Sequence, residues 1–252
     1  MRRRMMRKKP RKAFLDGDIL AYQTAFWAEV NDPDDFPIKL EKLVKQWTPD
    51  GVDDITIALS CSRVDNFRRN IWPDYKANRE DLYIPEYLLD VKDHMRYKYK
   101  CKELPSLEAD DILGIYTYSN KAIAVTIDKD LKGVCGWHYN PRKDEELRFI
   151  TKKEARRFFF EQWMTGDSVD GLPGLWRIGP KTAQKMLEEW DEGDWEGCII
   201  ELYTSDKYKP KKKYDMSSKD VAVAMAQCVN ILTTETYNLK TNKISLWVPK
   251  DG

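Results

Sequence analysis

Short apolar runs alternate along the chain with segments of helical spacing. Three of these runs are largely apolar and predict buried strands: residues 12–15, 55–59 and 122–127. Residues 134–150 predict two more strands around Asn140-Pro141. Helical spacing predicts helices over 19–30, 38–47, 85–99 and 106–118, the last with Ser106 as its N-cap. Buried strands that alternate with helices predict an α/β fold, in which a mostly parallel central sheet is flanked by helices.

The pattern becomes helical from residue 151 onward. Thr151 and Glu154 form a capping-box pattern before a helix over 155–164. A glycine-rich turn over 166–179 follows, and further helices are predicted over 180–190, 194–203 and 217–232. We therefore expect a basic N-terminal tail over 1–12, an α/β domain over 13–150 and a helical C-terminal domain over 151–252.

Composition excludes several kinds of protein. The five cysteines are scattered and form no Cys-x-x-Cys pair, which argues against a zinc site or a disulfide framework and favours a reducing, cytoplasmic location. The two histidines, His94 and His138, do not form a metalloprotease motif. No run approaches the roughly 20 apolar residues of a membrane span, so we expect no membrane partner.

Charge is informative locally rather than overall. The formal net charge is only +1, so it does not identify a partner. Residues 1–12 and 207–213 are nevertheless rich in Lys and Arg. Each block either lies along an anionic polymer or is a solvated tail or loop, and the sequence leaves both interpretations open.

Acidic residues form four short clusters, two of which directly follow predicted strands. The clusters contain Asp16 and Asp18; Glu108, Asp110 and Asp111; Asp128 and Asp130; and Asp167 and Asp170. Because ligands of a parallel sheet bind outside the carboxyl ends of its strands, we expect these carboxylates to converge there. Converging carboxylates repel one another unless cations neutralise them, and oxygen ligands favour Mg²⁺ or Mn²⁺. The alternatives are helix-dipole complementation at 108–111 and plain turn formation at 167–170.

Two basic segments have the character of phosphate-binding sites. Residues 174–183 combine glycines with a helix start at Pro180, where free backbone amides, Lys181 and Thr182 provide an anion site; a tight αα-hairpin is the alternative. Lys76 and Arg79 lie on one face if their segment is helical, and they could clamp a phosphate. The neighbouring Arg63, Arg68 and Arg69 add positive charge, and Phe67, Trp72 and Tyr75 could stack on bases. A solvated basic face is the alternative for this second segment.

Together these segments resemble the 5′-nuclease (flap endonuclease-like) family, especially stand-alone bacteriophage 5′–3′ exonucleases and the 5′-nuclease domain of bacterial DNA polymerase I. The matching stretches are Phe14-Leu15-Asp16-Gly17, Asn66-Phe67-Arg68-Arg69, Tyr75-Lys76-Ala77-Asn78-Arg79, Glu108-Ala109-Asp110-Asp111, Asp128-Lys129-Asp130-Leu131, 166–174 and 178–183. The resemblance implies a helical arch within about 79–105 and a helix-three-turn-helix that grips duplex DNA at about 165–190.

The resemblance also assigns roles to individual residues. Asp16, Glu108 and Asp110 are expected to hold a first metal ion, and Asp128, Asp130 and Asp170 a second. Asp167 is expected as a further ligand and Asp111 as a catalytic residue beside them. Lys76 and Arg79 match residues that contact the scissile phosphate, and Arg68 and Arg69 are expected to bind DNA. Gly174, Gly179, Lys181 and Thr182 match the duplex-gripping loop, which in relatives also holds K⁺.

The chain departs from the family pattern at one position. The family usually carries an aspartate after the second strand, where this chain has Ser60 and Cys61. A thiol is a poor Mg²⁺ ligand, so we expect a weakened first metal site that is completed by water or relies on Mn²⁺. On this hypothesis, Cys61→Asp tightens metal binding.

The sequence therefore predicts a monomeric nuclease that hydrolyses DNA near 5′ ends with two Mg²⁺ ions, for which Mn²⁺ can substitute. Flaps, nicks and RNA–DNA hybrids are the substrates that the resemblance implies, with a role in primer removal beside a replication polymerase. A phage-encoded protein of this kind would act in the host cytoplasm. Two alternatives remain: a non-catalytic or weakly active protein that binds branched DNA, and a metal-dependent ribonuclease.

Overall fold

The computed structural model describes residues 8–211 and 214–250. Most of the predicted N-terminal tail, residues 1–7, and the last two lysines of the block at 207–213 lie outside these ranges. No helix in the part that is described has the length and apolar character needed to cross a membrane.

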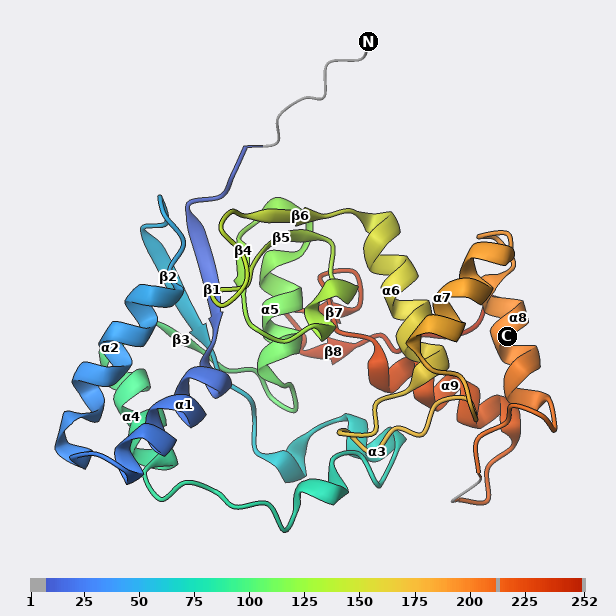
Figure 1. Ribbon diagram of the computed structural model, residues 1–252, viewed down its shortest axis with the longest axis horizontal. Coiled ribbons are helices and arrows are strands. Elements are labelled where there is room, and N and C mark those ends of the chain that lie inside the picture. Colours follow the sequence, from blue (N-terminus) through green and yellow to red (C-terminus); the bar gives the residue numbers. More distant parts are fainter. Residues whose placement is uncertain (1–7, 212–213, 251–252) are drawn as a thin grey trace.

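A six-stranded sheet forms the centre of the molecule (Figure 1). Its strands are β1 (Lys12–Asp16), β2 (Asp54–Ala58), β3 (Cys101–Lys102), β4 (Ile123–Val125), β5 (Gly136–Tyr139) and β6 (Arg148–Ile150). Their order is β3-β2-β1-β4-β5-β6, and only the β5–β6 pair is antiparallel. The predicted mostly parallel sheet is thus confirmed. The two-residue strand β3 was not predicted, because two residues carry no period that a sequence can reveal.

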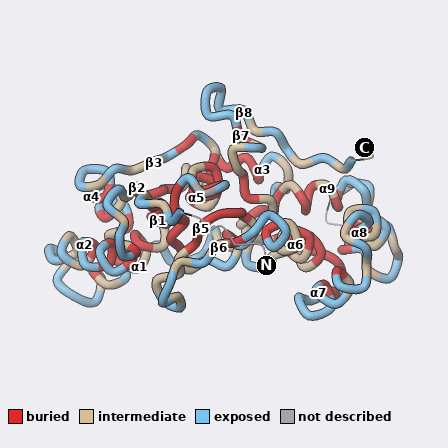
Figure 2. The backbone as a smooth tube through the Cα atoms, turned by 90° about the horizontal axis from the view of Figure 1, so that it is seen from above, coloured by how far each residue is buried: buried red, intermediate tan, exposed pale blue. Residues whose placement is uncertain are grey.

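Helices cover both faces of this sheet. Helices α1 (Gly17–Glu29), α2 (Phe36–Trp47) and α4 (Leu88–Lys98) share one apolar core with Ala13 and Leu15 of β1. Helix α5 (Ala109–Thr117) packs in a second core with Phe14, the residue between them. This alternation follows from the pleat of a strand, which sends successive side chains to opposite faces. Figure 2 shows the buried strands between exposed helical surfaces.

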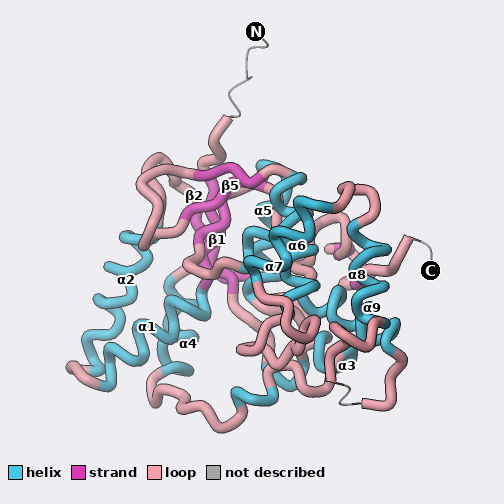
Figure 3. The backbone as a smooth tube through the Cα atoms, turned by 45° about the vertical axis from the view of Figure 1, so that its right-hand side comes forward, coloured by secondary structure: helices cyan, strands magenta, loops and turns pink. Residues whose placement is uncertain are grey.

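Four helices form a third core beside the sheet (Figure 3). They are α6 (Lys152–Thr165), α7 (Pro180–Glu189), α8 (Trp195–Thr204) and α9 (Ser218–Val229). The capping box of Thr151 and Glu154 at the start of α6 is confirmed. The centre of this core contains Trp163 and Tyr203, both fully buried, and the Tyr203 hydroxyl donates to the Trp163 carbonyl oxygen at 2.6 Å.

The start of α5 differs from the prediction. Ser106 has a φ of 61° and lies outside the helix. Glu108 is the N-cap instead, and its backbone N–H donates to the Asp111 carboxylate at 3.3 Å. The remaining helical elements are α3 (Arg68–Ile71) and 3₁₀ turns at Pro33–Asp35, Arg63–Asp65, Ala77–Arg79, Tyr118–Asn120 and Asp130–Gly133.

The chain returns to the sheet domain after α9. Ile231, Leu232 and Tyr237 are buried in the core that contains α5. A small antiparallel hairpin follows, β7 (Tyr237–Asn238) with β8 (Lys243–Ile244), which the sequence did not predict. Residues 231–244 therefore pack on the α/β layer, whereas Trp247 returns to the C-terminal helices, where its ring lies 4.9 Å from that of Trp163.

Gly114 of α5 allows this return segment to approach closely. A Cβ atom at Gly114 would lie 2.3 Å from the Leu232 carbonyl oxygen and 2.7 Å from Ile231 Cγ2. We expect Gly114→Ala to lower the free energy of unfolding by about 1–3 kcal/mol, because the backbone must move away. Urea unfolding followed by circular dichroism measures this change.

Gly197 offers a matched control, because it is an exposed glycine in helix α8 with no atom within 4 Å of a Cβ there. Gly197→Ala is expected to raise the free energy of unfolding by about 0.5–1 kcal/mol, because alanine has the higher helix propensity. Equal effects of the two substitutions would contradict the close contact at Gly114.

Candidate functional site

A cavity of about 790 Å³ opens at the carboxyl ends of the central strands. All seven predicted metal ligands line it: Asp16, Glu108, Asp110, Asp128, Asp130, Asp167 and Asp170. Lys76 and Arg79 line the same cavity, as do Asp18, Cys61 and Lys92. The fold thus brings together acidic residues that are separated by up to 154 positions in the sequence, from Asp16 to Asp170.

The ends of β1 and β4 fix the centre of this site. Asp16 is the last residue of β1 and the N-cap of α1, and its Oδ1 accepts from the Ile19 amide at 3.2 Å. Its Oδ2 accepts from the Thr126 hydroxyl at 2.8 Å, just beyond β4. The Thr126 hydroxyl in turn accepts from the Asp128 amide at 3.0 Å. Thr126, which the sequence did not single out, therefore links Asp16 to the Asp128 turn.

Five of the seven predicted ligands have no cationic partner. Within the described residues, no ion pair involves Asp16, Asp110, Asp128, Asp130 or Asp167, because the cations around the cavity pair with Glu108, Asp170 and Asp18. Burial, followed by the charge of neighbouring aspartates, raises the pKa of Asp16 and that of Asp110. Burial and Asp128 likewise raise the pKa of Asp130 to about 7. This unneutralised negative charge fits a hard divalent cation with oxygen ligands.

The other two predicted ligands, Glu108 and Asp170, are neutralised by the protein itself. Lys76 forms an ion pair with Glu108 and lies 3.6 Å from Asp170, while Arg79 forms an ion pair with Asp170. The Tyr75 hydroxyl donates to Glu108 at 2.6 Å and lies 3.3 Å from Asp170. Although burial alone would raise the pKa of Glu108, the charges of Lys76 and Arg68 lower it to about 2.

This arrangement leaves the carboxylates short of a finished coordination shell. Throughout 8–211 and 214–250, no three Asp, Glu, His or Cys side chains are grouped as a ready metal site. The ion pairs explain why, because Glu108 and Asp170 are each directed at a cation. A metal ion would have to compete with Lys76 and Arg79 for these two carboxylates.

The segment that carries Lys76 and Arg79 is bound directly to the loop of Asp167 and Asp170. The Lys76 amide donates to the Asp170 carbonyl oxygen at 2.8 Å, with a φ of 56° at Lys76. Asn78 donates to two carbonyl oxygens of this loop, at Ser168 and Val169. Two motifs about 90 residues apart therefore form one structural unit.

Two of the predicted site residues lie in the interior of this structure, where they pair with each other. Arg68 was expected to bind DNA, but it is only 3% exposed, and its guanidinium donates to Asp111 at 2.6 and 2.7 Å. It also donates to the carbonyl oxygens of Cys228 and Asn230. Asp111 was expected to be catalytic, but it is fully buried, does not line the cavity and accepts from the Leu232 amide at 3.1 Å. The pair joins α3, α5 and the segment after α9.

The interleaved aromatic residues are also not a stacking surface. Phe67, Trp72 and Tyr75 are all buried, and Trp72 and Tyr75 belong to the C-terminal core. Basic neighbours in the sequence do not show whether an aromatic side chain is exposed or buried. Arg69, by contrast, lies nearer the surface and pairs with Glu80 at 2.8 Å, so its contact with DNA stays a prediction.

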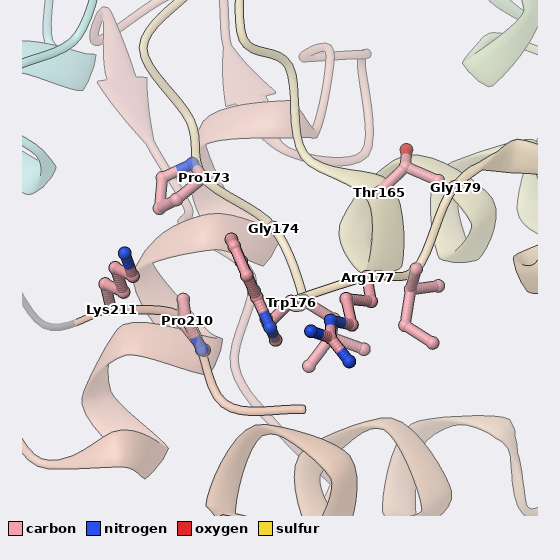
Figure 4. A pocket seen from close by; sticks show the side chains of 10 residues that line it. Thr165, Pro173, Gly174, Trp176, Arg177, Gly179, Pro210 and Lys211 are labelled. Atoms are coloured by element: carbon pink, nitrogen blue, oxygen red, sulfur yellow. The ribbon is translucent and has the colours of Figure 1, made fainter. Parts of the chain in front are cut away.

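A second surface lies at the loop between α6 and α7 (Figure 4). A cavity of about 510 Å³ is lined there by Gly174, Gly179, Arg177, the half-exposed Trp176 and Lys211. Lys181 and Thr182 are exposed in the first turn of α7. Gly174 is buried with a φ of 58°, and a Cβ there would lie 2.3 Å from the Thr165 carbonyl carbon. Its visible role is close packing of the loop.

The loop that begins the lysine block is attached to this surface. The Trp176 amide donates to the Tyr208 carbonyl oxygen at 2.7 Å, and Lys211 Nζ lies 5.3 Å from the centre of the Trp176 ring. Lys211 therefore lines the same cavity as Gly179, the residue that precedes α7.

The predicted arch segment, 79–105, contains helix α4 and a preceding loop. Leu88, Val91 and Met95 of α4 are buried with α1 and α2, so this helix covers the sheet. Leu82 and Tyr83 of the loop are exposed. Lys92 of α4 lines the cavity, and the arch itself stays a prediction.

Comparison with known proteins gives a consistent set of relatives, although no family model matches the chain. DNA polymerase I of Rhizobium leguminosarum is 30% identical over 203 residues, which are 74% of this chain and 20% of that protein. The exonuclease of Escherichia phage T7 is 24% identical over 223 residues, 77% of this chain and 74% of that protein. The chain thus spans only a fifth of the length of the polymerase.

Solved structures show the same fold. A bacteriophage T5 protein co-crystallised with metal ions has a TM-score of 0.62 and 14% identity, covering 87% of this chain and 89% of that chain. A T5 flap endonuclease in a complex with DNA and metal ions has a TM-score of 0.58 and 15% identity over the same shares. At such identities the likeness concerns the fold alone.

The buried Arg68–Asp111 pair can be tested against the adjacent arginine. We expect Arg68→Ala to lower the free energy of unfolding by about 3–5 kcal/mol, because Asp111 is left charged and uncompensated in the interior. Arg69→Ala removes a more exposed ion pair with Glu80 and should cost at most about 1 kcal/mol. Urea unfolding of both variants measures the difference, and similar losses would contradict a structural role specific to Arg68.

Proposed function

We propose that the chain is a member of the 5′-nuclease family and that it hydrolyses DNA phosphodiesters near 5′ ends in a structure-specific, metal-dependent manner. One observation carries the proposal: unneutralised carboxylates at the ends of β1 and β4 share a cavity with Lys76 and Arg79. A site that merely bound phosphate would favour cations alone, because each added carboxylate repels the ligand. Carboxylates and cations together suit a reaction at a phosphodiester.

In this proposal the carboxylates hold two divalent ions. Asp16, Glu108 and Asp110 hold one, Asp128, Asp130 and Asp170 the other, and Asp167 lies beside the second. Mg²⁺ is the expected ion and Mn²⁺ a substitute, since all of these ligands are oxygen. The chemistry that such a pair supplies when bound is the activation of water and the stabilisation of the leaving oxygen.

Lys76 and Arg79 have a separate task. Each now pairs with a carboxylate that an ion would claim, so ion binding would release these cations toward a phosphate. In the paired state burial alone would lower the pKa of Lys76, but Glu108 and Asp170 raise it above its ordinary value, so the side chain is charged there. The hydrogen bond from the Lys76 amide to the Asp170 carbonyl oxygen does not involve these side chains, so it would keep the backbone of the Lys76 segment in place when they are released. The two side chains would then offset charge that develops on the scissile phosphate.

Duplex DNA would bind along the second surface. The exposed amides at the start of α7, with Gly179, Lys181 and Thr182, suit the phosphate backbone as a helix-three-turn-helix, where K⁺ could also bind. The lysines at 207–211 would extend this contact. The loop before α4 would border the path of a 5′ flap as the proposed arch. RNA–DNA hybrids would be further substrates. The protein would act as a monomer beside a replication polymerase.

Cleavage of labelled substrates tests this function directly. A 5′ flap, a nicked duplex, an RNA–DNA hybrid and a single-stranded RNA are incubated with Mg²⁺, Mn²⁺ or EDTA. We expect cleavage near the 5′ end of the duplex substrates with either ion, and none in EDTA. Cleavage of single-stranded RNA only would favour a ribonuclease.

A variant separates catalysis from binding. Asp128→Ala/Asp130→Ala is expected to abolish cleavage yet to keep or tighten DNA affinity, because the substitutions remove negative charge from the site. If the wild type cleaves no DNA in either ion but binds the flap, the protein is a branched-DNA-binding protein and the nuclease proposal is wrong.

The duplex surface can be examined through salt dependence. We expect Lys181→Ala and Lys211→Ala each to reduce the slope of log affinity against log salt by about one, as for the loss of one phosphate contact. Lys42→Ala, on the exposed side of α2, is the control and should leave the slope unchanged. Fluorescence anisotropy at several salt concentrations gives the slopes. Identical slopes in all proteins would exclude this surface.

A further inference from the structure

The carboxyl end of β2 has no carboxylate of its own, yet one reaches it from the start of α1, which follows the neighbouring strand β1. Asp16 pairs with Ala58 in the parallel register of β1 and β2, so the residues after both strands lie side by side. Asp18, two residues beyond Asp16, directs its Oδ2 to the Ser60 amide, which donates to it at 3.3 Å. A carboxylate is therefore held beside the backbone of the very residues where the family carries an aspartate.

Neither residue of β2's end replaces that aspartate. The Ser60 hydroxyl accepts from the Ala109 amide at 2.8 Å and so serves the start of α5. The Cys61 thiol lies 3.2 Å from the Ser62 carbonyl oxygen, and a neutral thiol is a poor ligand for a hard cation. The missing ligand has to come from another element if it is present at all.

Asp18 has the position and the freedom to supply it. It lines the cavity, and its side chain is 23% exposed. Its other oxygen accepts from Lys92 Nζ of α4 at 2.7 Å. This is the same arrangement as at Glu108 and Asp170, where a lysine or arginine now pairs with a carboxylate that an ion would claim.

We propose that Asp18 supplies, from the start of α1, the metal-ligating carboxylate that Cys61 does not supply from the end of β2. The carboxylate has changed its element but not its place in the cavity. Lys92 holds it until a divalent ion binds and then releases it. The inference rests on the proposed metal-dependent function and adds a ligand to it.

With Asp18 as a ligand, the effect of Cys61→Asp on metal affinity should depend on whether the Asp18 carboxylate is present. If Asp18 already provides the ligand, an aspartate at position 61 adds little to the wild type. In a chain that lacks the Asp18 carboxylate, the same aspartate restores the missing ligand. The two substitutions should therefore be strongly non-additive, as is usual for residues that share one partner.

Calorimetric titration with Mn²⁺ in the absence of DNA tests this without relying on activity. We expect Asp18→Asn to weaken the binding of one ion by about tenfold or more, as losses around a metal ion commonly do. Cys61→Asp alone should change affinity by less than about twofold, and Asp18→Asn/Cys61→Asp should recover most of the loss. Asp65→Asn is the matched control, because it removes an exposed charge near Cys61 and should have little effect.

The outcomes separate this inference from the function on which it rests. A wild type that binds no Mn²⁺ would overturn the metal-dependent function and this inference with it. Wild-type binding that Asp18→Asn leaves unchanged, or weakens no more than Asp65→Asn, would overturn this inference alone.

Lys92→Met provides a second measurement should Asp18→Asn fail to fold. It keeps the carboxylate and removes its competitor, so Mn²⁺ should bind at least as tightly as in the wild type. Weaker binding would show that the ion pair between α1 and α4 is what the site requires, and would contradict a ligand role for Asp18.

Discussion

Repulsion among carboxylates at one edge of the sheet is the constraint on which the rest of this structure depends. A parallel sheet places the ends of β1 and β4 side by side, and the chain puts aspartates at both. The protein meets this repulsion in two ways. Lys76, Arg79 and Lys92 form ion pairs with Glu108, Asp170 and Asp18, while burial and neighbouring aspartates raise the pKa values of Asp16, Asp110 and Asp130.

The same constraint explains why distant parts of the chain are joined so tightly around the site. The cations come from the segment after α3 and from α4, and the acids come from four other places. Arg68 and Asp111 lie just beneath, where they join α3 and α5 to the segment after α9. Their charges resemble those of the site, but they are sealed from solvent. A buried pair of this kind fixes the position of α5 and hence of Glu108 and Asp110 at its start.

The contrast between Arg68 and its neighbour Arg69 shows what could not be predicted from the sequence. The strands and most helices followed from apolar periodicity, and the convergence of acids followed from the rule for strand ends. Burial of a charged residue has no such local signal. Arg68 and Arg69 are neighbours with the same chemistry, yet the Arg68 side chain is buried and the Arg69 side chain lies nearer the surface. Their roles were decided by α5 and by residues 228–232, which no pattern near residue 68 reveals.

Asp18 illustrates the opposite case, in which the signal was present but its meaning depended on the fold. The sequence has an additional aspartate, Asp18, two residues after Asp16. After β2 it has Ser60 and Cys61, where the family pattern has an aspartate. Only the parallel register of the two strands places these positions together, and only the Ser60 amide shows which way Asp18 turns. A ligand set is defined by positions in space, so a chain can move one carboxylate to another strand end and keep the charge that the cavity requires. The departure at Cys61 then marks a rearranged site rather than a weakened one.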